Sequence, residues 1–321
     1  MIENLSIKNF KSIKDLSIDC KRINLFIGEP NAGKSNILEA LGVMSWCRYA
    51  GTLKDYVRFR SIMNLFYDDL LDEPVSIGAG KSKLNIKFES DNFNFEYGDK
   101  KRTICTMDYS GNIKGTMSPL PEAESIKFYR FLKRDQFPDT SSSFLMPPHG
   151  SNLFTVVMGN KKLRETMTRF FKNLSFNLVF KPQERTFEIQ KQTGDMVFSY
   201  PYILTSDTLQ TTIFHVIAME SNNDSTIVFE EPEAHAFPYY TKYLGEKIAL
   251  DGSNQYFIAT HNPYLLLSII EKARKDSINV FITYFRDYQT KVKCLTGDQM
   301  SELMEYDPFF NLNSFLEQAE K

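Results

Sequence analysis

The sequence has few cysteines and no excess of either charge. Its four cysteines, Cys20, Cys47, Cys105 and Cys294, lie too far apart in the chain for a zinc knuckle or a Cys-x-x-Cys redox pair. We therefore expect reduced thiols of the kind that cytosolic proteins keep. The formal net charge is −2 over 321 residues, which does not indicate a globally basic surface for nucleic acid but leaves a local basic groove open.

The chain also lacks the signals of membrane insertion, secretion and repetition. No apolar run approaches the roughly 18 residues that a membrane helix needs. Met1 is followed by Glu3 and a mixed polar and apolar stretch rather than by a signal peptide. We find no internal repeat, low-complexity tract or heptad pattern. These observations predict a cytoplasmic, globular protein without a membrane partner.

What the sequence does have is a phosphate-binding loop. Gly28–Ser35 matches G-x-x-x-x-G-K-[ST], between an apolar, strand-like run and a segment with helical spacing. Glycines let backbone N–H groups wrap a polyphosphate, Lys34 can reach the β- and γ-phosphates, and Ser35 can hold Mg²⁺. The residues expected to bind ATP here are Gly28, Glu29, Pro30, Asn31, Ala32, Gly33, Lys34 and Ser35.

A second motif is an apolar strand that ends in acids, Thr226–Glu233. If this strand lies near the one before the loop, Glu230 can reach Mg²⁺ directly or through water. Glu231 can then orient or activate the attacking water. The alternative is a strand that runs into a solvated acidic turn, which is less favoured in a chain with a phosphate-binding loop.

A third motif is the strand-like run Gln255–Asn262, which again has a polar end. In a parallel sheet, ligands bind beyond the carboxyl ends of the strands. His261 is therefore expected on the nucleotide side, where it can contact the γ-phosphate or the attacking water. The alternative is a strand-end histidine that only bonds a loop.

The remaining patterns predict an α/β fold with an insertion. From Ser206 onward helices and strands alternate, which predicts a mostly parallel sheet with crossover helices. The strand before Gly28 should join this sheet. We therefore assign residues 1–50 and 200–321 to a nucleotide-binding core and residues 51–199 to an inserted part.

Period-two alternation predicts an antiparallel β-subdomain inside the insertion. Its strands are expected over residues 83–88, 93–97 and 103–107. The other elements expected in this part are a helix over 56–71, a strand over 125–131 and a helix over 153–174, the last belonging to a helical lobe.

Together the motifs resemble those of the ABC-type ATPases of the RecF, SMC and OLD (overcoming lysogenization defect) group. The resemblance lies in Phe10–Ile13, Lys34–Leu41, Phe229–His235 and Ala259–Leu266. The acidic pair followed by Pro-Glu-Ala-His, with Thr-His-Asn-Pro downstream, is most similar to the OLD-like branch. The resemblance implies a P-loop NTPase fold with an ABC-type ATPase core, and ATP and Mg²⁺ as cofactors.

The resemblance also implies further site residues. Lys11 and Asn36 join the nucleotide-binding set, and a signature segment should precede the acidic strand. Ser206 and Thr208 stand in that place as donors to a γ-phosphate bound by a second subunit, although Ser206 is also a good helix N-cap. No glycine lies between Ser206 and Gln210, which departs from the usual signature.

Two more positions are implied by the family. Gln136 is the best candidate for the glutamine that reaches the metal, and a solvated loop residue is an equally good reading. His235 corresponds to a position that faces the dimer partner. No coiled-coil arm separates the core halves, and the segment after the His261 helix is too short for a Toprim nuclease domain, so we assign it to the ATPase core.

Three functions follow as hypotheses. The first is an ATPase that sandwiches ATP between two copies and hydrolyses it, with dimerisation driving or gating a DNA-related or defence process. The second is an ATP-switched regulatory or scaffold subunit whose effector, a nuclease or a toxin, is a separate chain. The third is a RecF-like ATPase of DNA repair or maintenance, with DNA as a partner.

Overall fold

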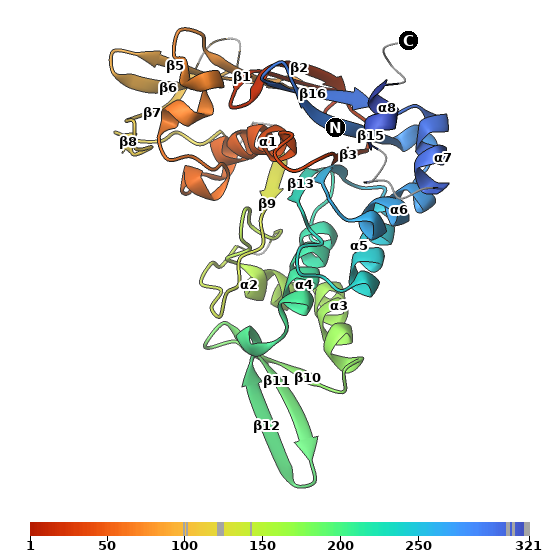
Figure 1. Cartoon of the computed structure of the whole chain (residues 1–321). Coiled ribbons are helices and arrows are strands. Elements are labelled where there is room, and N and C mark those ends of the chain that lie inside the picture. The colour runs from red at the N-terminus through yellow and green to blue at the C-terminus, as the bar shows by residue number, and fades with distance from the viewer. Residues whose placement is uncertain are drawn as a thin grey trace.

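The fold places one helix between two β-sheets, with a narrower lobe extending away from them (Figure 1). The computed structural model describes residues 1–98, 100, 102–120, 125–141, 143–305, 309 and 312–317. Helix α1 (Lys34–Tyr49) contacts strands of both sheets and is buried on nearly all sides. A helix covered on nearly all sides belongs in the interior, so α1 is fixed at the centre of the molecule.

A six-stranded sheet forms the core of the fold, in the order β16-β15-β3-β14-β13-β9. Its strands are β3 (Ile23–Ile27), β9 (Ile126–Tyr129), β13 (Thr226–Glu230), β14 (Gln255–Ala259), β15 (Ile278–Arg286) and β16 (Gln289–Cys294). Among the strands described for this sheet, β15 and β16 pair antiparallel and the other pairings are parallel. The predicted mostly parallel sheet is therefore confirmed.

Helices pack against the face of this sheet that α1 leaves open. They are α4 (Asp207–Glu220), α5 (Pro238–Leu250) and α6 (Pro263–Lys272). The core strands are buried on both faces, as parallel strands covered by crossover helices are. Along these strands, apolar side chains alternate between the two faces of the sheet. Such a strand therefore packs into two hydrophobic clusters, one on each face.

The second sheet has seven strands and is antiparallel, as the alternation predicted. Its order is β2-β1-β4-β5-β6-β7-β8. Its strands are β1 (Asn4–Phe10), β2 (Ile13–Asp19), β4 (Val75–Ala79), β5 (Ser82–Glu89), β6 (Asn92–Tyr97), β7 (Arg102–Met107) and β8 (Ile113–Lys114). The assigned division at residues 50 and 200 stays a prediction. Strands of the assigned core pair with strands of the inserted part in both sheets. β1 pairs with the inserted strand β4, and β9 pairs with β13 of the core.

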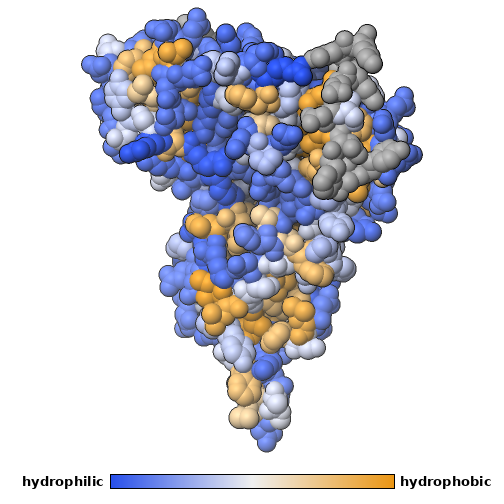
Figure 2. Space-filling model, in the orientation of Figure 1, coloured by the Kyte–Doolittle hydropathy of each residue, from blue (hydrophilic) through white to orange (hydrophobic). Residues whose placement is uncertain are grey.

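The extending lobe contains two helices and a three-stranded sheet. Its elements are α2 (Leu153–Gly159), α3 (Lys161–Lys172), β10 (Asn177–Lys181), β11 (Thr186–Thr193) and β12 (Met196–Pro201). The single helix predicted over residues 153–174 is interrupted because the Asn160 side chain accepts hydrogen bonds from the N–H groups of Lys162 and Leu163, which begins a new helix. Figure 2 shows hydrophobic residues on the surface of this lobe, where Leu174 and Leu204 are exposed.

The helix predicted over residues 56–71 is wrong. The segment forms short 3-10 turns, η1 (Leu53–Asp55), η2 (Ile62–Leu65) and η3 (Tyr67–Asp69). The Leu65 carbonyl accepts a hydrogen bond from the Lys11 N–H rather than from a helical neighbour. Asp68 and Asp69 have φ values of 52° and 57°, which an α-helix does not tolerate.

Smaller elements complete the fold. They are η4 (Tyr202–Leu204), η5 (Lys275–Ser277), α7 (Gly297–Glu305) and α8 (Leu312–Glu317). Across the residues that were described, we find no helix with the length and apolar character to cross a membrane.

Candidate nucleotide-binding site

The strand order brings the three sequence motifs to one edge of the core sheet. β14 pairs in parallel with β3 on one side and with β13 on the other. The phosphate-binding loop follows β3, Glu230 ends β13, and His261 follows β14. Carboxyl ends of adjacent parallel strands are the usual place for a ligand in an open α/β sheet.

Lys34 is folded back on its own loop. Its Nζ donates to the carbonyl oxygens of Gly28 and Glu29, each at 2.8 Å. Lys34 is 5% exposed, and burial lowers its pKa to about 8. The acceptors described for this ammonium group are uncharged carbonyls, so an incoming phosphate offers it a better partner. Glu29, Pro30 and Asn31 are exposed at the tip of the loop.

Both glycines of the loop are required by close packing. Gly33 has a φ of 101°, and a Cβ there would lie 1.9 Å from Thr290 Oγ1. Gly28 has a φ of 146°, and a Cβ there would lie 2.1 Å from the Thr283 carbonyl oxygen. Strands β15 and β16 therefore press directly against the loop, and any larger residue at these positions would displace it.

A chain of hydrogen bonds supports the loop from the same side. The Asn36 amide donates to Ser12 Oγ (2.7 Å), and Thr290 Oγ1 donates to the Ala32 carbonyl (3.0 Å). The two hydroxyls lie 2.7 Å apart, and since the Thr290 proton is already used, Ser12 donates to Thr290. Asn36 and Ala32 thus both belong to the support of the loop, and their contact with nucleotide stays a prediction.

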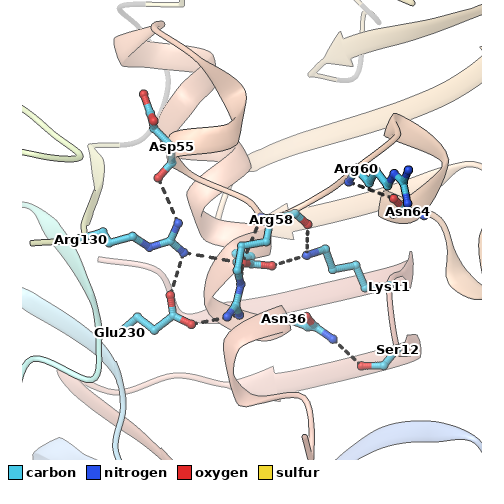
Figure 3. Close-up of polar contacts among 10 residues, drawn as sticks. Lys11, Ser12, Asn36, Asp55, Arg58, Arg60, Asn64, Arg130 and Glu230 are labelled. Carbon is cyan, nitrogen blue, oxygen red and sulfur yellow. Dashed lines mark hydrogen bonds and ion pairs between the residues drawn. The ribbon is translucent and has the colours of Figure 1, made fainter. Parts of the chain in front are cut away.

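Glu230 is held by two arginines (Figure 3). Arg130 Nη2 lies 2.8 Å from one carboxylate oxygen and Arg58 Nη2 lies 3.2 Å from the other. Burial opposes ionisation, but a hydrogen bond from Ser35 and the charges of Arg130 and Arg58 outweigh it and lower the pKa of Glu230. A carboxylate beside the Ser35 hydroxyl is the donor set that Mg²⁺ takes in phosphate-loop proteins.

The same arginines converge on Glu39, which is fully buried in α1. Glu39 Oε1 accepts from Arg58 Nε at 2.6 Å and lies 3.6 Å from Arg130 Nη2, while Oε2 pairs with the Lys11 ammonium group. Burial lowers the pKa of Lys11, and the neighbouring Glu39 acts against that shift. Lys11, predicted to bind nucleotide, therefore belongs to a cation cluster that Glu39 holds beside Glu230.

Sequence reasoning missed Glu39, Arg58 and Arg130. Glu39 stands four residues after Ser35, one helical turn along α1, and an acid in an apolar helix is a signal that could have found it. Arg130 directly follows β9, so it would have been found if that strand had been assigned to the core sheet. Arg58 lies in the segment that was wrongly predicted to be helical.

Glu231 and His261 face each other beyond the strand ends. His261 Nε2 lies 3.2 Å from Glu231 Oε1, and their side chains are 39% and 44% exposed. Burial, and then the charge of Lys34, lower the pKa of His261, while Glu231 acts in the opposite direction. The imidazole is therefore largely neutral at neutral pH, so it has one N–H donor and one acceptor nitrogen.

The signature segment lies on the other side of a cavity. The cavity has a volume of about 390 Å³ and is lined by Ser35, Arg58, Arg130, Lys133, Asp207, Glu230, Glu231 and His235, among others. Ser206 Oγ caps α4 by accepting from the Leu209 N–H, and Thr208 Oγ1 donates to the His235 carbonyl. Gln136 is exposed in the loop after β9 and does not line this cavity.

The fold and the three strand-end motifs define a P-loop ATPase of the ABC type. The chain belongs to the AAA ATPase domain family, whose profile matches residues 1–195. The resemblance to ABC-type ATPases of the RecF and SMC group is thereby confirmed, whereas the narrower assignment to the OLD-like branch stays a prediction.

Curated relatives are similar over parts of the chain. The DNA double-strand break repair Rad50 ATPase of Pyrococcus abyssi is 29% identical over 134 residues, 40% of this chain and 13% of its own length. An ATP/GTP phosphatase of Helicobacter pylori is 52% identical over 42 residues, 13% of this chain and 11% of its own. The chain thus spans a small part of both relatives.

Solved structures are similar over nearly the whole chain. An Smc head bound to the C-terminal winged-helix domain of ScpA gives a TM-score of 0.53 at 17% identity, covering 93% of this chain and 99% of that one. A second Smc head with an extended coiled coil, bound to the C-terminal domain of ScpA derived from Pyrococcus furiosus, gives 0.53 at 14% identity, covering 95% and 98%. The fold is that of an SMC head domain.

Proposed function

We propose that this protein binds ATP with Mg²⁺ and hydrolyses it at a composite site between two copies of the chain. The observation that carries the proposal is the convergence of Lys34, Glu230, Glu231 and His261 at the ends of neighbouring strands. Each of these groups has a separate task in phosphoryl transfer to water.

The roles follow from the surroundings of each group. Lys34 would exchange its carbonyl partners for phosphate oxygens, and Ser35 with Glu230 would hold Mg²⁺. When bound, Mg²⁺ would offset the negative charge of the phosphates. Among the described residues no group of three or more His, Cys, Asp or Glu side chains could hold a metal alone, which fits a site that the nucleotide itself completes.

Glu231 and His261 would handle the water. The Glu231 carboxylate accepts a hydrogen bond from the attacking water and orients it, and proton transfer to it as the water attacks is general-base catalysis. The neutral His261 ring has a single N–H, and it would turn this donor from Glu231 to the γ-phosphate on the same side when ATP is bound. Lys34 and the metal would stabilise the negative charge on the phosphoryl group.

The second copy is proposed because of the signature segment. Ser206 uses its oxygen to cap α4, which leaves its proton for another acceptor, and the residue is exposed. The Thr208 proton is already donated to His235. Ser206 is therefore the better donor to a γ-phosphate held by a second copy.

A DNA-related process is the favoured setting for this activity. The similarity to a DNA double-strand break repair ATPase and the Smc head fold support it. The second candidate is an ATP-switched regulatory or scaffold subunit whose effector is a separate nuclease or toxin, as in defence systems of the OLD-like kind. The absence of glycine between Ser206 and Gln210 favours slow turnover and hence this candidate.

Replacement of Glu231 by Gln tests the proposal. The Gln side chain keeps the size and loses the carboxylate, so steady-state ATP hydrolysis should fall by about 100-fold or more while ATP still binds. Glu271→Gln, an exposed acid on α6, is the matched control and should not change turnover. Undiminished hydrolysis by Glu231→Gln would reject the assignment, and strong stimulation by DNA would favour the DNA-related setting over the scaffold.

A further inference from the structure

Glu233 is a buried acid to which no task in binding or hydrolysis has been given. It lies in the turn after β13 and is 7% exposed. Its Oε1 accepts from Thr260 Oγ1 at 2.5 Å and from the His261 N–H at 3.2 Å. Its Oε2 is buried and has no hydrogen-bond partner among the residues that the structure describes. The acid therefore joins the turn after one strand to the segment after the next.

The chemistry of the group accounts for its burial. Burial is the main cause that raises the pKa of Glu233 to about 7, and the charge of Glu231 adds to it. Protonation of a buried carboxyl removes the charge that desolvation penalises. Glu233 makes two hydrogen bonds through Oε1. An apolar side chain of the same size could not make them.

These bonds extend the register of the sheet beyond its strands. The last paired residues of β13 and β14 are Glu230 and Ala259. The Glu231 N–H then donates to the Ala259 carbonyl at 2.9 Å, and Glu233 bonds Thr260 and His261. Hydrogen bonds thus continue to join the two segments beyond the ends of their strands.

These hydrogen bonds affect the relative position of Glu231 and His261, the two side chains to which the proposed function assigns the attacking water. Glu231 and His261 are each about two-fifths exposed, and a contact between side chains as exposed as these is weak by itself. We infer that Glu233 is a positioning residue that holds His261 against Glu231 through its bond to the His261 backbone. The inference rests on the proposed roles of Glu231 and His261 for its catalytic meaning, but the contact itself can be measured without ATP.

The test is a histidine titration by NMR in a double-mutant cycle. The chain has four histidines, so the His261 signal can be assigned with His261→Gln. The charged groups that face His261 are Lys34 and Glu231. In the otherwise unchanged protein, Glu231→Gln should lower the measured pKa of His261, because it removes the negative charge beside the ring.

If Glu233 positions His261, the pKa shift caused by Glu231→Gln should depend on which side chains stand at positions 233 and 260. In Glu233→Ala and in Thr260→Val, the shift caused by Glu231→Gln should fall to less than about half. In Glu233→Gln, which keeps an acceptor for Thr260 and His261, and in Thr260→Ser, which keeps the hydroxyl, the full shift should remain. An equal shift in all backgrounds would overturn the inference, whether or not the protein hydrolyses ATP.

Turnover gives a second readout. Because the phosphate-binding loop is untouched, Glu233→Ala should lower kcat by about tenfold and leave KM for ATP within about twofold. Glu233→Gln should restore kcat. If Glu233→Ala does not fold, Thr260→Val and Thr260→Ser carry both measurements. A parallel loss in the Ala and Gln variants, or in both Thr260 variants, would contradict positioning through these hydrogen bonds.

Discussion

The phosphate-binding half of the site and the signature segment differ in how firmly the chain holds them. Lys34 is 5% exposed and Glu39 is fully buried, and each is fixed by several hydrogen bonds. Ser206 and Asp207 are exposed, and Leu204 beside them is 69% exposed. One half is preorganised by the chain itself, while the other presents its donors outward. The difference supports a site that a second copy completes.

The extending lobe, which precedes the signature segment in the chain, shares this character. Its strand β12 is exposed along its whole length, whereas β3 and β14 are buried throughout. Groups that bind and activate phosphate need fixed geometry, which a buried sheet edge provides. A surface that meets another protein does not need to be covered within its own chain.

The largest effect that would sharpen this comparison is expected at Gly33. Gly33→Ala puts a Cβ 1.9 Å from Thr290 Oγ1 at a φ of 101°, so the loop must move and ATP affinity should fall by about 100-fold or more. Calorimetric ATP titration measures it. Gly194→Ala, at a φ of 60° with nothing near its Cβ, is the matched control for backbone strain. Equal ATP affinity of both variants would show that the loop is not held by β16.

The cation cluster gives the next effect. Glu39→Gln leaves Lys11 and Arg58 without their buried counter-charge, which should lower the free energy of unfolding by about 2–3 kcal/mol. Denaturant unfolding measures it. Glu165→Gln removes an exposed pair with Lys161 and should cost under about 0.5 kcal/mol. Similar losses would mean that Glu39 does not organise the cluster.

Two buried groups beside the fixed half should give opposite pH dependences. Burial lowers the pKa of His215 to about 4, so its contribution to stability is present above pH 6.5 and is lost as pH falls below that. Burial raises the pKa of Glu233 to about 7, so its contribution is present at low pH and is lost as pH rises from 4.5 through 7.

Between pH 7 and pH 5 each group should change the free energy of unfolding by about 2 kcal/mol, with opposite sign. The two nearly cancel in the unchanged protein. Relative to it, His215→Gln should gain stability as pH falls over this range, and Glu233→Gln should lose it. Chemical unfolding at both pH values measures the slopes, and equal slopes in the two variants would contradict the burial of these groups.

The signature half should show a smaller effect that is confined to turnover. Ser206→Ala removes the proposed γ-phosphate donor, and turnover should fall by about tenfold with ATP affinity nearly unchanged. Ser206→Asp keeps an N-cap acceptor for Leu209 but has no hydroxyl proton, so it should also be slow. If Ser206→Asp turns over like the unchanged protein, capping is the only role of Ser206.

The sequence predicts those elements whose structure depends on a local residue pattern. The loop Gly28–Ser35, the strand before Glu230 and the strand before His261 were predicted because motif and periodicity coincide there, and the parallel sheet followed from their alternation with helices. Helix α4 over Asp207–Glu220 begins after Ser206 as its capping chemistry predicts.

What depends on partners distant in sequence could not be predicted in this way. Residues 56–71 lack an α-helix because the Leu65 carbonyl accepts from the Lys11 N–H and left-handed residues follow it. Arg130 becomes a site residue because β9 pairs with β13, and Arg58 does so because its segment returns to Glu39 of α1 and to Glu230. No local pattern records those contacts.

The most direct test of the composite site is the mass of the Glu231→Gln variant in solution with and without ATP and Mg²⁺, measured by light scattering after gel filtration. Since ATP should bind but not be hydrolysed, the account predicts one copy without ATP and two copies with it, and a return to one copy when Lys34→Ala is added to the variant. A single copy at saturating ATP, with binding verified by calorimetry, would contradict the claim that a second copy completes the site.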